Sequence, residues 1–233
     1  MLAIMRREVK AYFTSPIGYI VVAAFSFMSG LFYYMLVAQG VADMRNLFGT
    51  MYTVIMFLIP VLTMRLMSED KKIKTDQILL TAPVTVTGIV LGKYFAALFV
   101  YFIATLATVV QSAVIALFTV PEWGVIFTNY IGMLLLGATF IAIGMFISSL
   151  TENQVVAAIG SIAVAIFVTV ADSVVPQIKI KFLDAFLSDA TFSTRYSDFM
   201  NGVMNFSNVI FFLSIVAIFL FLSGRVLEKR RWS

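Results

Sequence analysis

The sequence predicts an all-α integral membrane protein with six transmembrane helices, and composition and charge spacing support this fold class. Of the 233 residues, 61% are hydrophobic and only 12% are charged, whereas soluble domains have about 45–50% apolar and about 25% charged residues. Charged residues leave six uncharged stretches, at 11–42, 46–64, 94–121, 123–151, 153–171 and 199–224. Each is longer than the roughly 18 apolar residues that a spanning helix needs, and an open sheet cannot satisfy its backbone in lipid.

Hydropathy trims these stretches to six spans within a single membrane domain, residues 1–233, without a separate soluble domain. The expected spans are 17–37, 47–67, 88–120, 125–150, 154–175 and 209–226. The third is longer than a bilayer requires, so it should tilt or extend out of the membrane. Lys93, near its start, could snorkel to the inner interface.

Basic residues predict a multi-pass protein of the cell membrane, plasma or inner, with both termini in the cytoplasm. Six spans place the termini on one side, and twelve of the 16 basic residues lie there, as cytoplasmic loops require. These twelve are Arg6, Arg7, Lys10, Arg65, Lys71, Lys72, Lys74, Lys93, Arg225, Lys229, Arg230 and Arg231. The other side has Arg45, Lys179, Lys181 and Arg195.

Residues 1–15 are expected to form an amphipathic helix lying in the headgroup plane. Its apolar stripe would be Leu2, Met5, Val9, Tyr12 and Phe13, and its polar face Arg6, Arg7, Lys10 and Thr14. Ser15 and Pro16 then suit the N-cap and first residue of the first span. A plain basic anchor without a mechanical role is the alternative.

The segment between the second and third spans has the densest charge in the chain, and its residues 68–87 are expected to form a docking loop. A short apolar patch within it, Ile78, Leu79 and Leu80, is followed by Pro83. Such a patch on a charged loop suggests insertion into another protein, although these leucines could instead pack against the N-terminal helix. The tight turn at 148–154 offers a second contact, with Thr151 and Gln154 spaced as a capping box.

No catalytic site is predicted. The chain has no His and no Cys and no GxxxxGK[ST] motif, which excludes zinc sites of the usual kind, thiol nucleophiles and a P-loop. No folded basic domain suits nucleic acid. Asp172 either lines a polar pathway or is an interfacial capping carboxylate, and Gln111 either lines a path or joins two helices by hydrogen bonding.

The outer segment 177–208 is too long for a simple connector and is expected to form two short amphipathic helices. Apolar residues recur at helical spacing in two groups, with a break around 188–193 and a further bend at Asn201 and Gly202. The groups are Phe182, Leu183, Phe186 and Leu187, and Tyr196, Phe199, Met200 and Val203. Both helices would dip into or lie on the outer leaflet.

Four stretches in order resemble one known family across essentially the whole chain. These are RREVKAYFTSPIGYIV (6–21), SEDKKIKTDQILLTAPVTVTGIVLGKY (68–94), SSLTENQ (148–154) and FLFLSGRVLEKRRW (219–232). Together they are similar to the membrane subunit of type-2 ABC exporters, particularly the gliding-motility and multidrug kinds.

The resemblance implies two paired permease subunits, identical or different, above two separate P-loop ATPase subunits that hold ATP and Mg²⁺. It makes residues 1–15 an elbow helix, the loop helix a coupling helix, and 177–208 a re-entrant helical hairpin at the pathway exit. The chain departs from the family at Lys74, where Gly is usual, and at Gln77, where Glu is usual. The coupling residues would be Glu69, Asp70, Thr75, Gln77, Ile78, Leu79, Leu80 and Pro83.

The function expected is therefore a permease subunit of an ATP-driven exporter, itself without ATPase activity, that moves a substrate or transmits force. A channel or secondary transporter, and a structural anchor of a larger complex, are the alternatives. The outer hairpin would either gate the path between paired subunits, with Phe186 and Phe199 as apolar seals, or cover it passively.

Overall fold

A computed structural model describes residues 1–40, 43–75, 84–174 and 191–231, and these residues form helices and turns without a strand. Six helices are long and apolar enough to cross a membrane, which confirms the predicted fold class. The elements are α1 (Leu2–Thr14), α2 (Pro16–Ala38), α3 (Arg45–Thr63), α4 (Ser68–Lys72), α6 (Val86–Ile115), α7 (Trp123–Leu150), α8 (Gln154–Val174), α10 (Phe192–Met200) and α11 (Phe206–Arg231).

Three span ends differ from those that hydropathy predicts. The second span leaves α-helical geometry after Thr63, and a turn at 64–67 leads into α4. The third ends at Ile115, several residues before Pro121, whose ring disfavours helix just ahead of it. The sixth continues to Arg231, because charged residues outside the bilayer extend a helix that a hydropathy window cuts short.

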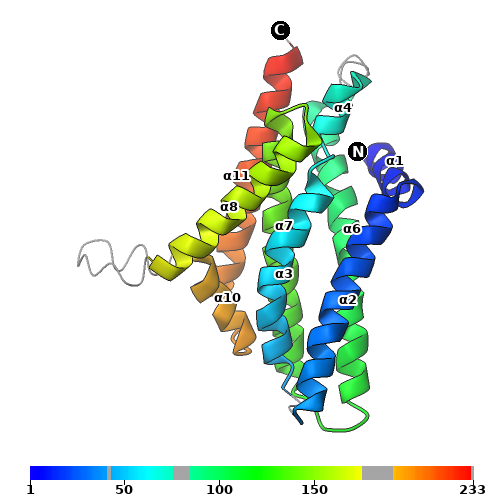
Figure 1. The fold of residues 1–233 in the computed structure, drawn as a ribbon. Coiled ribbons are helices and arrows are strands. Elements are labelled where there is room, and N and C mark those ends of the chain that lie inside the picture. Colours follow the sequence, from blue (N-terminus) through cyan, green and yellow to red (C-terminus); the bar gives the residue numbers. More distant parts are fainter. Residues whose placement is uncertain (41–42, 76–83, 175–190, 232–233) are drawn as a thin grey trace, which may run out of the picture.

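α7 is the central helix of the bundle (Figure 1). Of its most apolar stretch 72% is buried, against 17% for α2, α8 and α11. Three glycines on α7 let neighbours approach closely, because a Cβ at Gly132, Gly137 or Gly144 would overlap Phe199, Tyr101 or Thr63. Small residues allow such contacts between helices in membranes.

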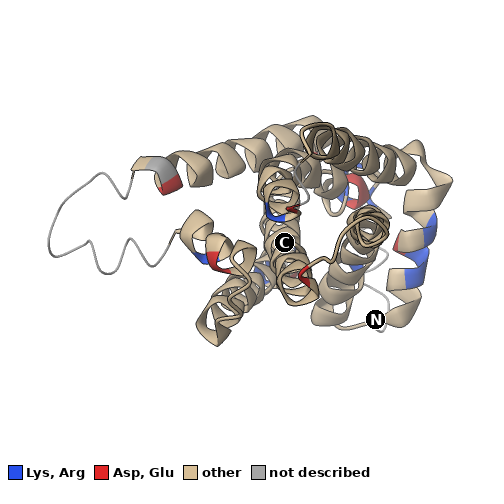
Figure 2. Ribbon diagram, turned by 90° about the horizontal axis from the view of Figure 1, so that it is seen from below, with Lys and Arg blue, Asp and Glu red and all other residues tan. Residues whose placement is uncertain are grey.

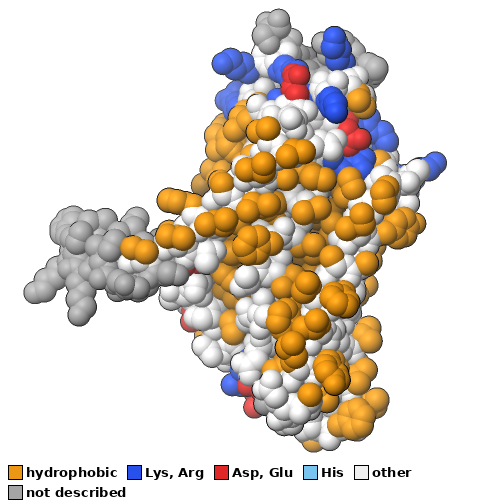
Figure 3. Space-filling model, in the orientation of Figure 1, with side chains coloured by type: hydrophobic (Ala, Val, Ile, Leu, Met, Phe, Trp, Pro, Cys, Tyr) orange, Lys and Arg blue, Asp and Glu red, His pale blue; other side chains and the backbone are white. Residues whose placement is uncertain are grey.

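The two ends of the bundle differ in charge. α1, α4 and the C-terminal end of α11 lie at one end (Figure 1), where Lys, Arg, Asp and Glu side chains gather above a broad apolar band (Figure 3). Below, this end is called the charged end and the other the opposite end. Both termini are on the charged side of the apolar band, as an even number of spans requires.

α8 leans away from the bundle, and α10 starts beside its tip (Figure 1). The ring of Phe192, at the start of α10, lies 5.9 Å from that of Phe140, just past the midpoint of α7. α10 then runs toward the opposite end, where Gly202 turns the chain with a φ of 80° before α11. α10 therefore lies alongside the spans. The other predicted outer helix, with Phe186, falls outside the described residues.

Candidate functional site: an ion cluster at the charged end

Lys93 is the centre of a buried group of charges. It lies on α6, is 1% exposed, and its Nζ donates to the backbone oxygen of Leu66 (2.7 Å) and to Glu8 Oε1 (3.1 Å). The same Nζ is 2.7 Å from Asp70 Oδ2, an ion pair in which that oxygen accepts no hydrogen bond from the described residues. The expectation that Lys93 snorkels to the interface is wrong, because two carboxylates bind it inside the protein.

Arg7 completes the ion cluster, defined here as Arg7, Glu8, Asp70 and Lys93. Its guanidinium lies 2.6 Å from Glu8 and 3.7 Å from Asp70, so two cations face two carboxylates. Burial acts to raise the pKa of Glu8, but the charges and hydrogen bonds of Lys93 and Arg7 outweigh it and leave that pKa below its ordinary value. The cluster joins α1, α4 and α6, and removing one partner of a buried group of this kind costs about 3–5 kcal/mol.

α1 turns a different face inward from the one predicted. Ile4, Glu8 and Tyr12 are buried, whereas Leu2 of the expected apolar stripe is 67% exposed. Positions 4, 8 and 12 are one helical turn apart, and Glu8 belongs to the buried face because it has cationic partners. Figure 2 shows basic residues along the outer side of this helix and an acidic one on its inner side.

The remaining predicted elbow residues divide between the surface and the bundle. Arg6 and Lys10 are exposed, as the predicted polar face requires, and Phe13 is half-buried. A Cβ at Gly92 would meet Ile4 at 3.0 Å, so α1 packs closely on α6. The helix is therefore docked on the bundle, with its basic side and its N-terminal end exposed.

A second set of contacts fixes the corner between α1 and α2 to the end of α3. Tyr12 Oη donates to the Leu62 backbone oxygen (2.8 Å), and Arg65 lies over the Tyr12 ring and donates to Ser15 Oγ (2.6 Å). Arg65 also pairs with Glu69 at 2.8 Å. Pro16 starts α2 as predicted, but the Ser15 side chain forms no N-cap bond, because it binds Arg65 and Tyr12 instead.

The last turn of α7 holds α4 from the other side. Ser148 Oγ accepts the backbone N–H groups of Met67 and Ser68, both at 3.1 Å, and donates to the Met64 oxygen at 3.0 Å. Lys71 Nζ donates to the backbone oxygen of Ser149. One serine thus satisfies the backbone where α3 passes into α4.

The capping box predicted at Thr151 and Gln154 is wrong in its residues. Asn153 Oδ1 accepts the N–H of Val155 (2.9 Å) and caps α8, while Thr151 Oγ1 accepts the N–H of Asn153 (3.1 Å). Asn is a favourable N-cap residue, and the capping-box pattern placed the cap two residues too early, at Thr151.

Only part of the predicted coupling segment is described. Glu69 pairs with Arg65, Asp70 belongs to the ion cluster, and Thr75 is half-buried. The other predicted coupling residues lie outside the described residues: Gln77, Ile78, Leu79, Leu80 and Pro83. Lys74 has a φ of 60°, in the left-handed region that favours glycine. This is the position at which the resembling family usually has Gly.

Asp172 has three partners near the tip of α8. It accepts the N–H groups of Phe192 (3.0 Å) and Ser193 (2.9 Å) at the start of α10, and the hydroxyl of Tyr52 (2.9 Å). These are the contacts of a capping carboxylate, and negative charge there complements the helix dipole. A pathway role for Asp172 remains a prediction.

Gln111 joins α6 to α2 through its Nε2, which donates to Ser29 Oγ at 3.1 Å. Its Oε1 is buried and accepts no hydrogen bond from the described residues. The contact is of the kind expected for a bond between helices, and a path-lining role is untested.

Phe199 is fully buried within its own chain. Its ring fills the space over Gly132 and lies 6.2 Å from the ring of Phe212. Because the ring packs inside its own chain, a seal formed by it would be internal. The gating role of Phe199, like that of Phe186, stays a prediction.

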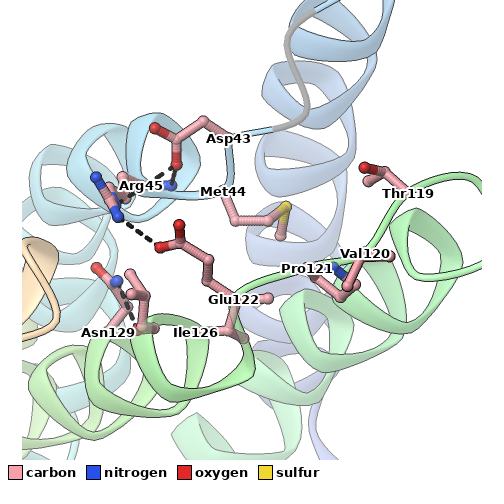
Figure 4. Close-up of a pocket in the computed structure, with 10 residues that line it drawn as sticks. Asp43, Met44, Arg45, Thr119, Val120, Pro121, Glu122, Ile126 and Asn129 are labelled. Atoms are coloured by element: carbon pink, nitrogen blue, oxygen red, sulfur yellow. Dashed lines mark hydrogen bonds and ion pairs between the residues drawn. The ribbon is translucent and has the colours of Figure 1, made fainter.

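A pocket of about 280 Å³ opens at the opposite end, between the α2–α3 connection and the α6–α7 connection. Arg45 crosses it to pair with Glu122 at 2.7 Å and lies 3.9 Å from Asp43 (Figure 4). These contacts tie the α2–α3 connection to the start of α7. All three charges are partnered within the pocket.

Comparison with known proteins identifies the family of the chain. No curated protein matches it, but residues 2–232 match the family model of the ABC-2 family transporter proteins. The match covers essentially the full length, including α1, the ion cluster and the C-terminal end of α11. The protein is therefore a multi-pass membrane protein of the ABC-2 transporter family.

Proposed function

We propose that this protein is the permease subunit of an ATP-driven exporter, coupled through residues 68–87 to a separate P-loop ATPase that holds ATP and Mg²⁺. Family membership supports the permease role. The observation that carries the coupling is the position of α4, which is bonded to α1 and α6 through Asp70, to α7 through Ser68, and to Arg65 in the turn after α3 through Glu69. A force on α4 would therefore act directly on three other helices and on the end of the second span.

The turn between α7 and α8 supports the same function. Residues around it line a small pocket together with Lys72 of α4, and Glu152 pairs with Arg230 of α11 at 2.6 Å. The described part of the docking segment, this turn and the C-terminal end of α11 thus lie together at one charged surface, which fits a soluble partner. A second permease subunit, identical or different, completes the proposed complex.

We place this surface in the cytoplasm, where the excess of basic residues belongs. Single cysteines at Thr75 and Asn205 test the orientation, since the native chain has no cysteine. An impermeant thiol reagent should label Asn205→Cys in intact cells and Thr75→Cys only after the membrane is opened. Labelling of both from one side would contradict six spans.

Coupling is tested by Leu79→Asp combined with Leu80→Asp, outside the described residues. Loss of a buried Leu costs about 2–5 kcal/mol, enough to release a transient partner. The variant should insert normally but lose the co-purified ATPase or its permease-stimulated turnover. Val120→Asp, the same change at an exposed site of the opposite end, should retain both. An unaltered complex and turnover in the leucine variant would contradict the docking role.

A further inference from the structure

An apolar groove runs between α6 and α11 near the charged end. Its volume is about 410 Å³, within the usual range of 300–1,000 Å³ for ligand sites. One helical face of each helix forms its walls. The lining residues are Val86, Thr87, Val90 and Leu91 of α6, and Leu220, Phe221, Gly224, Arg225 and Glu228 of α11.

Contacts on either side of the groove fix the position of its mouth along the bundle. On the side of the span, the ring of Phe219 lies 5.6 Å from that of Phe146, about one turn before α7 ends. On the other side, Arg230 pairs with Glu152 in the turn after α7. Arg225 and Glu228 lie between these levels, where the apolar sequence of the span gives way to charged residues.

The wall of the groove has room for a hydrocarbon chain. A Cβ at Gly224 would meet nothing within 4 Å, whereas the next residue toward the span, Ser223, is fully buried. The side chains of Leu220 and Phe221 continue the apolar wall toward the bilayer core. A lipid tail there would replace loosely packed space by close contacts.

The mouth of the groove has two opposite charges side by side. Arg225 Nη1 lies 3.0 Å from Glu228 Oε2, with side chains 65% and 44% exposed, and the guanidinium is 5.1 Å from the Phe221 ring centre. A pair this exposed contributes little by itself, so it can open to take a ligand. Guanidinium suits phosphate bidentately, and a carboxylate accepts hydrogen bonds from a primary ammonium.

We propose that this groove binds a phospholipid with a zwitterionic, primary-ammonium headgroup, phosphatidylethanolamine, from the leaflet at the charged end. Arg225 binds its phosphate, Glu228 its ammonium, and the walls one acyl chain. A second groove of about 430 Å³, between α2 and α6 at the opposite end, has no charged lining residue. It therefore offers no comparable selection of a headgroup.

Native mass spectrometry of the delipidated protein, titrated with phosphatidylethanolamine, phosphatidylcholine or phosphatidylglycerol, tests the proposal. The wild type should prefer the ethanolamine lipid by about two- to fivefold, as single exposed ion pairs allow. Glu228→Gln should remove the preference over choline, whose quaternary ammonium donates no N–H. Arg225→Gln should weaken all three, and Gly224→Leu should block the groove whatever the headgroup.

Lys229→Gln is the matched control, an exposed charge on the same helix that does not line the groove. Each variant is first checked for an unchanged elution profile and melting temperature in detergent. Equal affinity for the three lipids, or full binding by Gly224→Leu, would overturn the proposal. So would efficient cross-linking between two chains carrying Gly224→Cys, because a second copy would then occupy the groove.

Discussion

The charged end and the opposite end hold their short helices by different physical means. At the charged end, α1 and α4 are joined to the bundle by ion pairs that centre on Lys93. At the opposite end, α10 is held by aromatic packing of Phe192 and Phe199 and by the cap from Asp172. Because Glu8 of α1 and Asp70 of α4 share Lys93, loss of that one residue should loosen both helices together. Packing contacts such as those of α10 are instead lost one at a time.

The largest effect is expected from Lys93→Met, which leaves Glu8 and Asp70 buried without their shared cation. We expect a loss of about 3–5 kcal/mol, read as a lower melting temperature in detergent and as faster proteolysis within α1. Adding Glu8→Gln and Asp70→Asn should recover much of the loss, since the one charge that then remains in the cluster, on Arg7, has a side chain 43% exposed to solvent. If Lys93→Met alone melts like the wild type, the cluster does not hold this end together.

Phe199→Ala tests the opposite end and should have a smaller effect. It empties the space over Gly132, and because neighbouring side chains can relax into part of that space, we expect about 3 kcal/mol, the lower end of the usual cost of truncating a buried Phe. Melting temperature measures this loss. Val203→Ala, an exposed apolar truncation in the turn after α10, is the control. A loss as large as that of Lys93→Met would remove the contrast between the two ends.

The same variant tests the gate predicted for α10. With expression and ATPase binding confirmed, altered transport or a leak would support gating, and wild-type transport without a leak would support a passive cover. Because Phe199 is buried in its own chain, any such effect must pass through the position of α10.

The difference between the ends also explains what the sequence could predict. Six spans follow from composition and from gaps between charges, both of which are local properties. The partners of Lys93 lie on α1 and α4, far away along the chain, so no local pattern could pair them. One signal was present, since Glu8 shares the helical face of Ile4 and Tyr12, and an acid on such a face indicates a buried partner.

Helix caps and ends show the same limit at smaller scale. Thr151 matches a capping pattern, but Asn153 makes the cap. Several polar residues in this turn could cap α8, and the direction in which the chain enters the helix decides which of them does. The backbone at the end of α3 is bonded by Ser148, which lies in the last turn of α7, far away along the chain. Patterns of residue type predicted that these helices exist, and tertiary contacts decided where they stop.

Acid should loosen the charged end selectively. Because Lys93 and Arg7 lower the pKa of Glu8 in the folded protein, its carboxylate stabilises the fold above the ordinary value of 4.5, and this contribution is lost as pH falls through the lowered pKa. After correction for the slower intrinsic exchange in acid, hydrogen-exchange protection should therefore fall in α1 before α10 on acidification below that value. With Glu8→Gln, the protection of α1 should no longer change over the same interval. Equal loosening of both helices would contradict a local effect.

The smallest effect is expected from Lys74→Gly, which tests whether the charged end carries backbone strain next to its ion pairs. Lys74 has a φ of 60°, which costs a residue with a Cβ about 1–2 kcal/mol, while glycine adopts it freely but loses more entropy on folding. Relief of the backbone strain should outweigh the entropy cost of glycine, so we expect the free energy of unfolding to rise by about 0.5–1 kcal/mol. This gain would be read as a higher melting temperature. Lys72→Gly, at an exposed position within the helical geometry of α4, should destabilise instead. If both glycines lower the melting temperature, the conformation at Lys74 is not strained.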